Sequence, residues 1–197
     1  TMYNDCVSRD GVMDFSIAPN DMPFFLDWPT FGTEDAMIGT AALLIYAAKK
    51  YLAINPLPAA ESLVEKLQGY LEKPCSHKCI RAFQILAGRR DEQDAAFLEN
   101  GGAEGLSTFM AYYILKADAL SGGQNMLSIL KEYYGGMLQR GATTFWEDFD
   151  IAWLKNSGRI DEFPAEGKTD IHGDYGAFCY KGLRHSLCHG WSAGILA

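Results

Sequence analysis

The sequence has no long hydrophobic run. Its longest nearly continuous apolar stretch, residues 41–48, is far shorter than the roughly 20 residues that a membrane-spanning helix needs. The first residues also lack the basic and then apolar pattern of a secretory leader. We therefore expect no membrane partner and no targeting segment in this sequence.

The sequence is also poor in positive charge. It has 17 Lys and Arg residues against 25 Asp and Glu residues, which gives a net charge of -8, and the basic residues are scattered. Nucleic-acid binding relies on clustered Lys and Arg that contact phosphates. The composition thus argues against nucleic acid as a partner and suits a neutral substrate such as a carbohydrate.

The cysteines cannot form a complete set of disulfides within one chain, because their number, five, is odd. Cys75 and Cys79 flank His77 and could suggest a metal clip. Structural zinc sites usually take four ligands from two matched pairs, and the sequence has no second pair at a suitable spacing. We expect neither a metal nor a cofactor, and the cysteines do not indicate a cellular compartment.

Periodicity predicts helices along most of the chain. With 197 residues and 48% hydrophobic content, residues 1–197 can form one domain with a sizeable core. The expected helices are 33–54, 58–73, 76–86, 91–100, 107–117, a segment after Gly123 that includes Met126–Tyr134, and a final one over 186–196. No convincing strand alternation interrupts them, so we predict an all-α array of helical hairpins.

Several details of these helices follow from the sequence. Thr33, Ser76, Asp91 and Ser107 are suited to cap the helices that they precede. Apolar residues nearly encircle 33–54, which predicts an inner helix buried on more than one side. In the segment after Gly123, the residues expected to face the core are Met126, Leu127, Leu130, Tyr133 and Tyr134. Residues 151–184 lack this periodicity and predict a long irregular segment.

Residues 141–150 combine acidic and aromatic side chains. The acids are Glu147, Asp148 and Asp150, and the aromatic residues are Phe145, Trp146 and Phe149. Such a stretch can hold a carboxylate beside a flat, hydroxylated ligand and shield it from water, as in a sugar site. It can equally be a loop whose rings pack on the core while its acids face solvent.

Two further segments carry residues of the same kind. Trp28, between Asp27 and Pro29, can be a sugar platform or a core residue. Near the end of the sequence, His189 can bond a ligand hydroxyl or lie buried at a helix start. Ser186, Cys188 and His189 could indicate acyl transfer, but adjacency in sequence is no evidence for a triad.

Glycoside hydrolysis is the reaction that these residues suit best. It uses two carboxyl groups on opposite sides of the scissile bond, one as acid and the other as base or nucleophile. Glu147 is the best single candidate, while Asp148 and Asp150 could bond sugar hydroxyls, position a water or only solvate the loop.

Four stretches of the chain carry a resemblance to a known family. They are DWP at 27–29, STFMAYY at 107–113, GATTFWE with the acids after it at 141–150, and RHSLCHGWSAG at 184–194. Together, and in this order, they resemble the catalytic domain of the α-L-rhamnosidases of glycoside hydrolase family 78. The resemblance implies an (α/α)6 toroid of alternating inner and outer helices. It also implies an inverting mechanism in which Glu147 is the general base that activates water against a terminal L-rhamnose.

The resemblance further implies which residues bind the sugar. His189 corresponds to the histidine that contacts the sugar in the family's final motif, and Trp28 and Trp146 correspond to aromatic positions near the rhamnose pocket. Asp27 and His185 belong to the same motifs, and we expect them to bind substrate as well.

The chain departs from the family's pattern in ways that matter for activity. Six hairpins require twelve helices, and the sequence predicts seven at most, which correspond to the later half of the toroid. The family's Arg-Asp-Glu block, which supplies the general acid, has no match, since residues 6–11 lack the glutamate. We therefore expect an incomplete barrel that is inactive or nearly so by itself and that can self-associate through its open flank.

Two alternatives belong to other functional classes. The chain could be a non-catalytic carbohydrate-binding module that uses Trp28, Trp146, His189 and Trp191 as its contact surface, or a helical scaffold without a ligand.

Overall fold

The computed structural model describes residues 7–8, 10–14, 26–27, 30, 35–163, 165–171 and 186–196. This part of the chain is mostly helical and contains no sheet, and its β-pairs are the isolated bridges Val7–Met13 and Ser157–Thr169. The prediction of an all-α protein is confirmed. None of the helices described is both long and apolar enough to cross a membrane.

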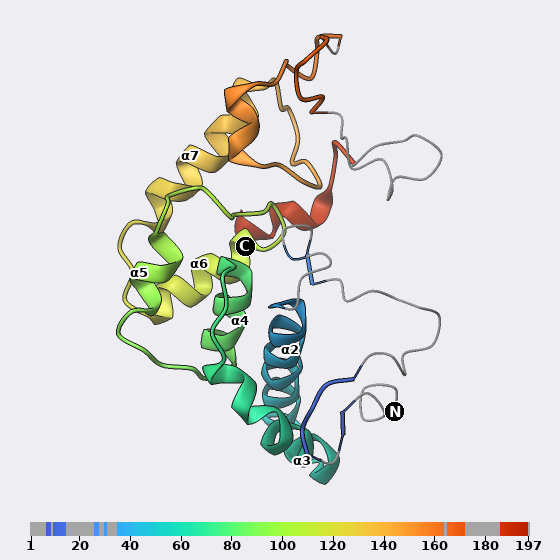
Figure 1. Ribbon diagram of the computed structural model, residues 1–197, viewed down its shortest axis with the longest axis vertical. Coiled ribbons are helices and arrows are strands. Elements are labelled where there is room, and N and C mark those ends of the chain that lie inside the picture. Colours follow the sequence, from blue (N-terminus) through green and yellow to red (C-terminus); the bar gives the residue numbers. More distant parts are fainter. Residues whose placement is uncertain are drawn as a thin grey trace.

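The helices between residues 35 and 139 follow one another closely along the chain (Figure 1). They are α2 (Asp35–Leu52), α3 (Pro58–Leu67), α4 (Lys78–Ala87), α5 (Asp94–Glu99), α6 (Ala111–Leu120) and α7 (Met126–Gln139), with the 3-10 helices η2 (Gln68–Glu72), η3 (Ile151–Lys155) and η5 (Gly190–Leu196).

Helices that alternate along the chain form one layer. The most extensive contacts join α2 to α4 and α4 to α6, and α6 in turn contacts η5 (Figure 1). Helix α3 packs beside α2, and the short α5 lies between α4 and α6 in sequence and contacts both. Helices α3 and α5 thus contact members of this layer without separating them.

Helix α4 is the most enclosed element. All of its residues except Leu86 are buried, including Lys78, Arg81 and Gln84. Helix α2, which the sequence predicted to be buried on more than one side, instead exposes Ala47, Lys49 and Lys50 near its C-terminal end. At the start of α2 the chain packs closely, since a side chain at Gly39 would meet Leu26.

Two predicted helix starts are displaced because their polar side chains make other bonds. Helix α4 begins at Lys78 without a side-chain cap, and the backbone N–H and hydroxyl of Ser76 donate to Asp35 Oδ2 of α2 at 2.8 and 2.7 Å. These bonds lower the pKa of the Asp35 carboxyl, although burial opposes them. Regular α6 begins only at Ala111, but the Ser107 hydroxyl accepts from Met110 N–H as a cap would. Thr33 lies outside the described residues.

The orientation of α7 is mostly as expected, with one error. Met126, Leu130 and Tyr133 face the core, whereas Leu127 is 65% exposed. The predicted final helix also differs, because residues 186–189 are irregular and the 3-10 helix η5 starts at Gly190. Both differences matter for the surface near residues 141–150, described below.

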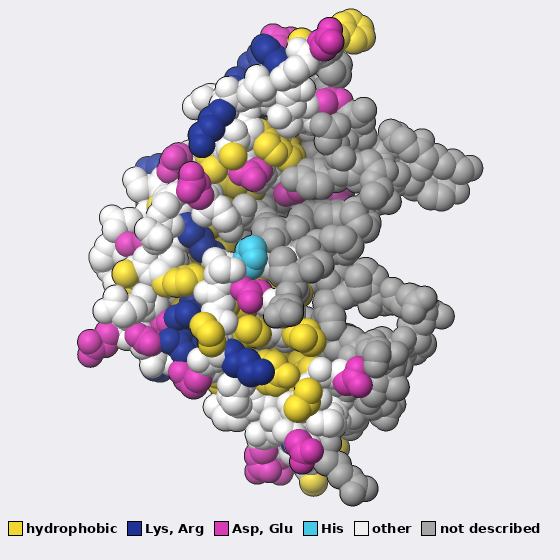
Figure 2. Space-filling model, viewed as in Figure 1, with side chains coloured by type: hydrophobic (Ala, Val, Ile, Leu, Met, Phe, Trp, Pro, Cys, Tyr) yellow, Lys and Arg dark blue, Asp and Glu magenta, His cyan; other side chains and the backbone are white. Residues whose placement is uncertain are grey.

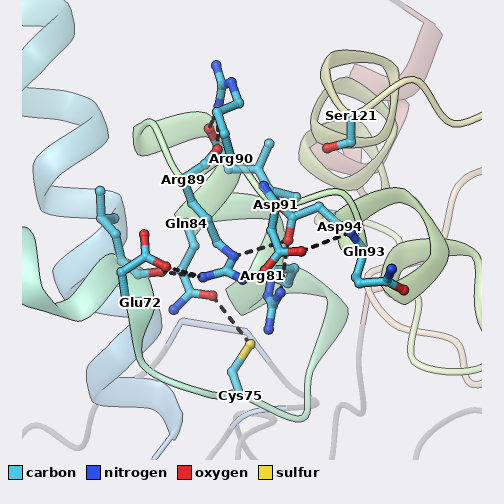
Figure 3. Close-up of polar contacts among 12 residues, drawn as sticks. Glu72, Cys75, Arg81, Gln84, Arg89, Arg90, Asp91, Gln93, Asp94 and Ser121 are labelled. Atoms are coloured by element: carbon cyan, nitrogen blue, oxygen red, sulfur yellow. Dashed lines mark hydrogen bonds and ion pairs between the residues drawn. The ribbon is translucent and has the colours of Figure 1, made fainter.

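Buried ion pairs join α4, α5 and η2 (Figure 3). Asp94 is almost completely buried, and its Oδ1 accepts from Arg81 at 2.9 Å and from Arg89 at 3.1 Å. Arg89 also donates to Glu72 and Asp91, each at 2.6 Å. Arg81 lies over the ring of Phe97 at 4.5 Å. Two guanidinium groups thus share one buried carboxylate inside the helical array, and Glu72 and Asp91 supply further negative charge to Arg89.

We predict that Asp94→Ala lowers the free energy of unfolding by about 3–5 kcal/mol, because it leaves two buried guanidinium groups without their shared partner. Urea denaturation followed by circular dichroism measures this loss. Asp161→Ala is the matched control, since it breaks an exposed pair with Arg159, and we expect little change. A loss at Asp94 as small as the control's would contradict a structural role for this carboxylate.

A second buried carboxylate has the opposite effect on stability. Asp118 of α6 is 2% exposed, and among the described residues its Oδ1 has no hydrogen-bond partner. Burial, together with the charge of Glu99, raises the pKa of Asp118 to about 6. Because the folded state favours the protonated acid, ionisation destabilises the fold at neutral pH, and this cost disappears as the pH falls from above 6 toward the ordinary value near 3.8.

We therefore predict that Asp118→Asn is more stable than the wild type at pH 7.5, by on the order of 1–2 kcal/mol, and that the advantage shrinks at pH 4.5. Paired urea titrations at the two pH values test this. An advantage of equal size at both would show that charge is not the cause.

Candidate active site

Residues 144–147 and 186–189 are held together by hydrogen bonds that involve their backbones. The N–H of Glu147 donates to the carbonyl of Ser186, and the N–H of His189 donates to the carbonyl of Phe145, each at 2.8 Å. The hydroxyl of Thr144 donates to the carbonyl of Leu187. Two predicted motifs that lie about forty residues apart therefore form a single structural unit.

Glu147 lies at the centre of this unit and is half-buried. Its Oε2 accepts from the backbone N–H of Ser186 at 2.7 Å, and its own carbonyl accepts from the Thr108 hydroxyl at 2.5 Å. In the described part of the structure, Oε1 accepts no hydrogen bond. The carboxylate is thus oriented through one oxygen and keeps the other for a ligand or water.

Asp27 connects the earliest of the four motifs to the same region. Its side chain is 4% exposed and accepts from the hydroxyl of Ser107, the residue that precedes Thr108. Thr30 donates to the carbonyl of Asp27 at 2.9 Å. Asp27 therefore positions the start of the 107–113 segment. Trp28 and His185, which the sequence also predicted to bind substrate, lie outside the described residues.

Trp146 packs beneath the loop. It has no exposed surface, lies edge-on to Phe149 at 5.9 Å, and its carbonyl accepts from the Ser192 hydroxyl at 2.8 Å. Phe149 in turn packs on Tyr133 and Trp153. Trp146 thus lies in the core, packed against Phe149. This position differs from the ligand-facing position expected from the sequence.

The other two acids of the loop have different surroundings. Asp150 is exposed, and its carboxylate caps η3 by accepting from Ala152 N–H at 2.8 Å. Asp148 is buried, and after burial itself it is the largest cause that raises the pKa of Tyr133 well above the ordinary value. The Tyr133 hydroxyl therefore stays protonated and donates to the Phe149 carbonyl at 2.5 Å.

His189 is half-buried, and its ring lies 5.7 Å from that of the exposed Trp191. The Ser186 hydroxyl accepts from Cys188 N–H at 3.3 Å, which is a local turn. Within the described ranges no side-chain hydrogen bond joins Ser186 or Cys188 to His189. The geometry therefore gives acyl transfer no support.

An apolar cavity of about 470 Å³ adjoins the loop. Helices α6 and α7, the loop and η5 all contribute to its walls, which include Leu115, Leu127, Tyr134, Leu138, Phe145 and Ile195. The exposure of Leu127 is explained by this position, since Leu127 faces the cavity and not the core. Phe145, two residues before Glu147 in the sequence, forms part of the cavity wall. Its ring packs edge-on against that of Tyr134, with 5.6 Å between the ring centroids.

The cysteines at positions 75, 79 and 188 are free thiols. No cluster of three or more His, Cys, Asp or Glu side chains suited to a metal ion occurs within the residues that the structure covers. Burial raises the pKa of both Cys75 and Cys79. The thiolate, which is the form that binds metals, is therefore less populated at both positions.

Comparison of the chain with protein-family models gave no match, and neither did comparison with curated proteins or with solved structures. The resemblance to α-L-rhamnosidases consequently remains a prediction from the four motifs.

Two hydroxyl side chains that fix the loop were not predicted as site residues. Thr108 donates its hydroxyl to the carbonyl of Glu147, and Ser192 donates its hydroxyl to the carbonyl of Trp146. Small hydroxyl side chains show no periodic pattern that would indicate such bonds. Their only signal was their place inside the quoted motifs.

We predict that Ser192→Ala lowers the free energy of unfolding by about 1–3 kcal/mol, because it leaves the buried carbonyl of Trp146 unpaired. Amide exchange at Glu147 and His189 should also accelerate, since both N–H groups bond across the same unit. Ser128→Ala on the exposed side of α7 is the control. Unchanged exchange at both amides would show that Ser192 does not hold the loop.

Proposed function

We propose that the chain is a part of an inverting glycoside hydrolase similar to α-L-rhamnosidases, with Glu147 as the general base and a terminal α-L-rhamnose as the substrate unit. The observation that carries this proposal is the set of bonds at Glu147. Thr108 and Ser186, from two other predicted motifs, each donate a hydrogen bond to Glu147. Asp27, from the remaining motif, accepts a hydrogen bond from Ser107, the residue before Thr108.

The geometry of Glu147 suits a base. Ser186 N–H holds Oε2, so that Oε1 can take a proton from water. In the inverting reaction this water forms a bond to the anomeric carbon as the bond to the leaving oxygen breaks, and its proton passes to Glu147. The N–H of His189 bonds the carbonyl of Phe145, two residues before Glu147, and we propose that the His189 side chain contacts a sugar hydroxyl.

We also propose that the helices form an incomplete (α/α)6 toroid, and the contacts within the helical layer support this arrangement. In such a toroid the inner helices are neighbours although each is separated in sequence by an outer one. The contacts from α2 to α4, α4 to α6 and α6 to η5 follow this rule, with α3 and α5 outside. The apolar cavity, together with exposed Leu127 and Leu138, provides the kind of flank through which we propose self-association.

The proposal has a consequence for substrates. No counterpart of the family's general-acid block is found in the sequence. General acid catalysis contributes typically ~10²- to 10⁴-fold, because an unprotonated alkoxide is a poor leaving group. A substrate whose leaving group needs no proton, α-L-rhamnosyl fluoride, therefore isolates the contribution of the base.

We predict that the chain hydrolyses α-L-rhamnosyl fluoride above the buffer rate, with β-L-rhamnose as the first product by proton NMR, and that p-nitrophenyl α-L-rhamnoside is turned over little or not at all. Glu147→Gln should reduce fluoride release by ~10²-fold or more. Asp150→Asn is the matched control, because this exposed acid of the same loop can keep its capping bond as an amide.

Other outcomes lead to different conclusions. Fluoride release that Glu147→Gln does not slow removes Glu147 from the role of base. Binding of L-rhamnose by calorimetry without any fluoride release favours the non-catalytic carbohydrate-binding module. Efficient hydrolysis of the aryl glycoside with a bell-shaped pH profile would place a second catalytic carboxyl group within this chain.

A further inference from the structure

A row of aromatic side chains leads away from the candidate active site. The ring of His189 lies 5.7 Å from Trp191, Trp191 lies 5.8 Å from Phe109, and Phe109 lies 5.8 Å from Tyr113. Tyr113 then lies 5.2 Å from Tyr112. We refer to these five residues, with Tyr46 of α2 at the far end, as the aromatic row.

The row crosses three elements of the helical layer. It starts at His189 just before η5, continues through Trp191 of η5, Phe109 and the first turn of α6, and reaches α2, where Lys116 of α6 interacts with both Tyr112 and Tyr46. Helix α6 contacts η5 directly, and these two elements lie next to each other in Figure 1. The row is thus continuous with the unit that holds Glu147, because His189 N–H bonds Phe145.

These rings are not fully buried. Trp191 is 71% exposed, and Phe109, Tyr112, Tyr113 and Tyr46 are each partly exposed. On the inner side, Tyr113 packs on the buried ring of Phe83 at 5.0 Å. One side of the row is therefore fixed by the core, while the other remains accessible to a ligand.

The chemistry of the row suits a sugar chain better than a purely apolar ligand. Aromatic rings offer flat apolar surface to the C–H faces of sugars, and the tyrosine hydroxyls and ammonium groups can bond sugar hydroxyls. Two cations lie at the far end of the row: Lys116 interacts with Tyr112 and Tyr46, and Lys50 Nζ lies 5.6 Å from the centre of the Tyr46 ring. On the face shown in Figure 2, Lys and Arg side chains are interspersed with Asp and Glu and do not form a patch that would attract a polyanion.

We propose that the aromatic row binds a glycan chain of several sugar units, whose terminal residue occupies the site at Glu147. This inference rests on the proposed function and adds to it the substrate class, an oligosaccharide or polysaccharide and not a small glycoside. From His189 to Tyr112 the rings lie at closely similar centroid spacings of 5.2 to 5.8 Å, and Lys116 connects Tyr112 to Tyr46, so that a chain can follow the row from one end to the other.

The test compares an α-linked rhamnotetraose with free L-rhamnose by isothermal titration calorimetry. We expect the tetraose to bind at least tenfold more tightly. Tyr46→Leu and Tyr112→Leu, which keep apolar volume but remove a ring, should each reduce that gain several-fold while L-rhamnose affinity and α-L-rhamnosyl fluoride hydrolysis stay unchanged. Tyr51→Leu is the matched control, because Tyr51 is an exposed tyrosine on the same helix α2 and outside the row.

The outcomes separate this inference from the function on which it rests. Fluoride hydrolysis with no gain for the tetraose overturns the aromatic row and leaves the proposed function standing. A gain that survives both row substitutions, in variants that circular dichroism shows to be folded, also overturns it. A gain that both substitutions reduce, without fluoride hydrolysis, supports the row as a glycan site and counts against the proposed catalysis.

Discussion

The carboxylate of Asp94, shared by Arg81 and Arg89, is the interaction on which the helical array depends most. Helix α4 packs against both α2 and α6, and nearly all its side chains are buried, including polar ones. Placing guanidinium groups in such a position costs several kcal/mol unless they are paired and bonded. Asp94 comes from α5, so the pairing that offsets the cost of burying Arg81 in α4 also holds α5 against α4.

The same need to satisfy buried polar groups extends around α4. Gln84 donates to the carbonyls of Tyr70 and Lys73, which ends η2 at a defined position, and Lys78 donates to the carbonyl of Gly102. Loops that would otherwise be free are thereby attached to the most enclosed helix. The layer of α2, α4 and α6 is consequently a rigid support, and the irregular segments at its end can hold side chains in fixed places.

How much of this could be predicted from the sequence depends on the type of interaction. Helical segments were predicted correctly because apolar periodicity and Gly or Pro signals report them directly, as for α3 between Pro58 and Leu67. The start of α4 was missed because Ser76 bonds Asp35 of another helix, a tertiary contact that no local pattern reports. Leu127 was assigned to the core because its spacing is helical, yet α7 has apolar residues on two sides and only one of them is covered.

The candidate site shows the same division. The motif around Glu147 was visible as a concentration of acids and rings, but which ring faces a ligand was not, because burial of Trp146 is decided by Phe149 and Ser192. The sequence likewise could not show that Asp150 is a cap and Asp148 a buried neighbour of Tyr133. These roles depend on where the backbone places each residue, and the alternation between half-buried and buried positions along 145–148 has no counterpart in composition.

The unit formed by residues 144–147 and 186–189 also has a mechanical consequence. Its bonds run between backbone groups and small hydroxyls, so the position of Glu147 is tied to that of His189 through Phe145 and Ser186. Trp191, which follows His189 by two residues, is in turn in contact with Phe109, just before the start of α6. A ligand that orders Trp191 against Phe109 would therefore restrict the same segment that orients the Glu147 carboxylate, and binding energy gained along the aromatic row could be used to hold the base in place.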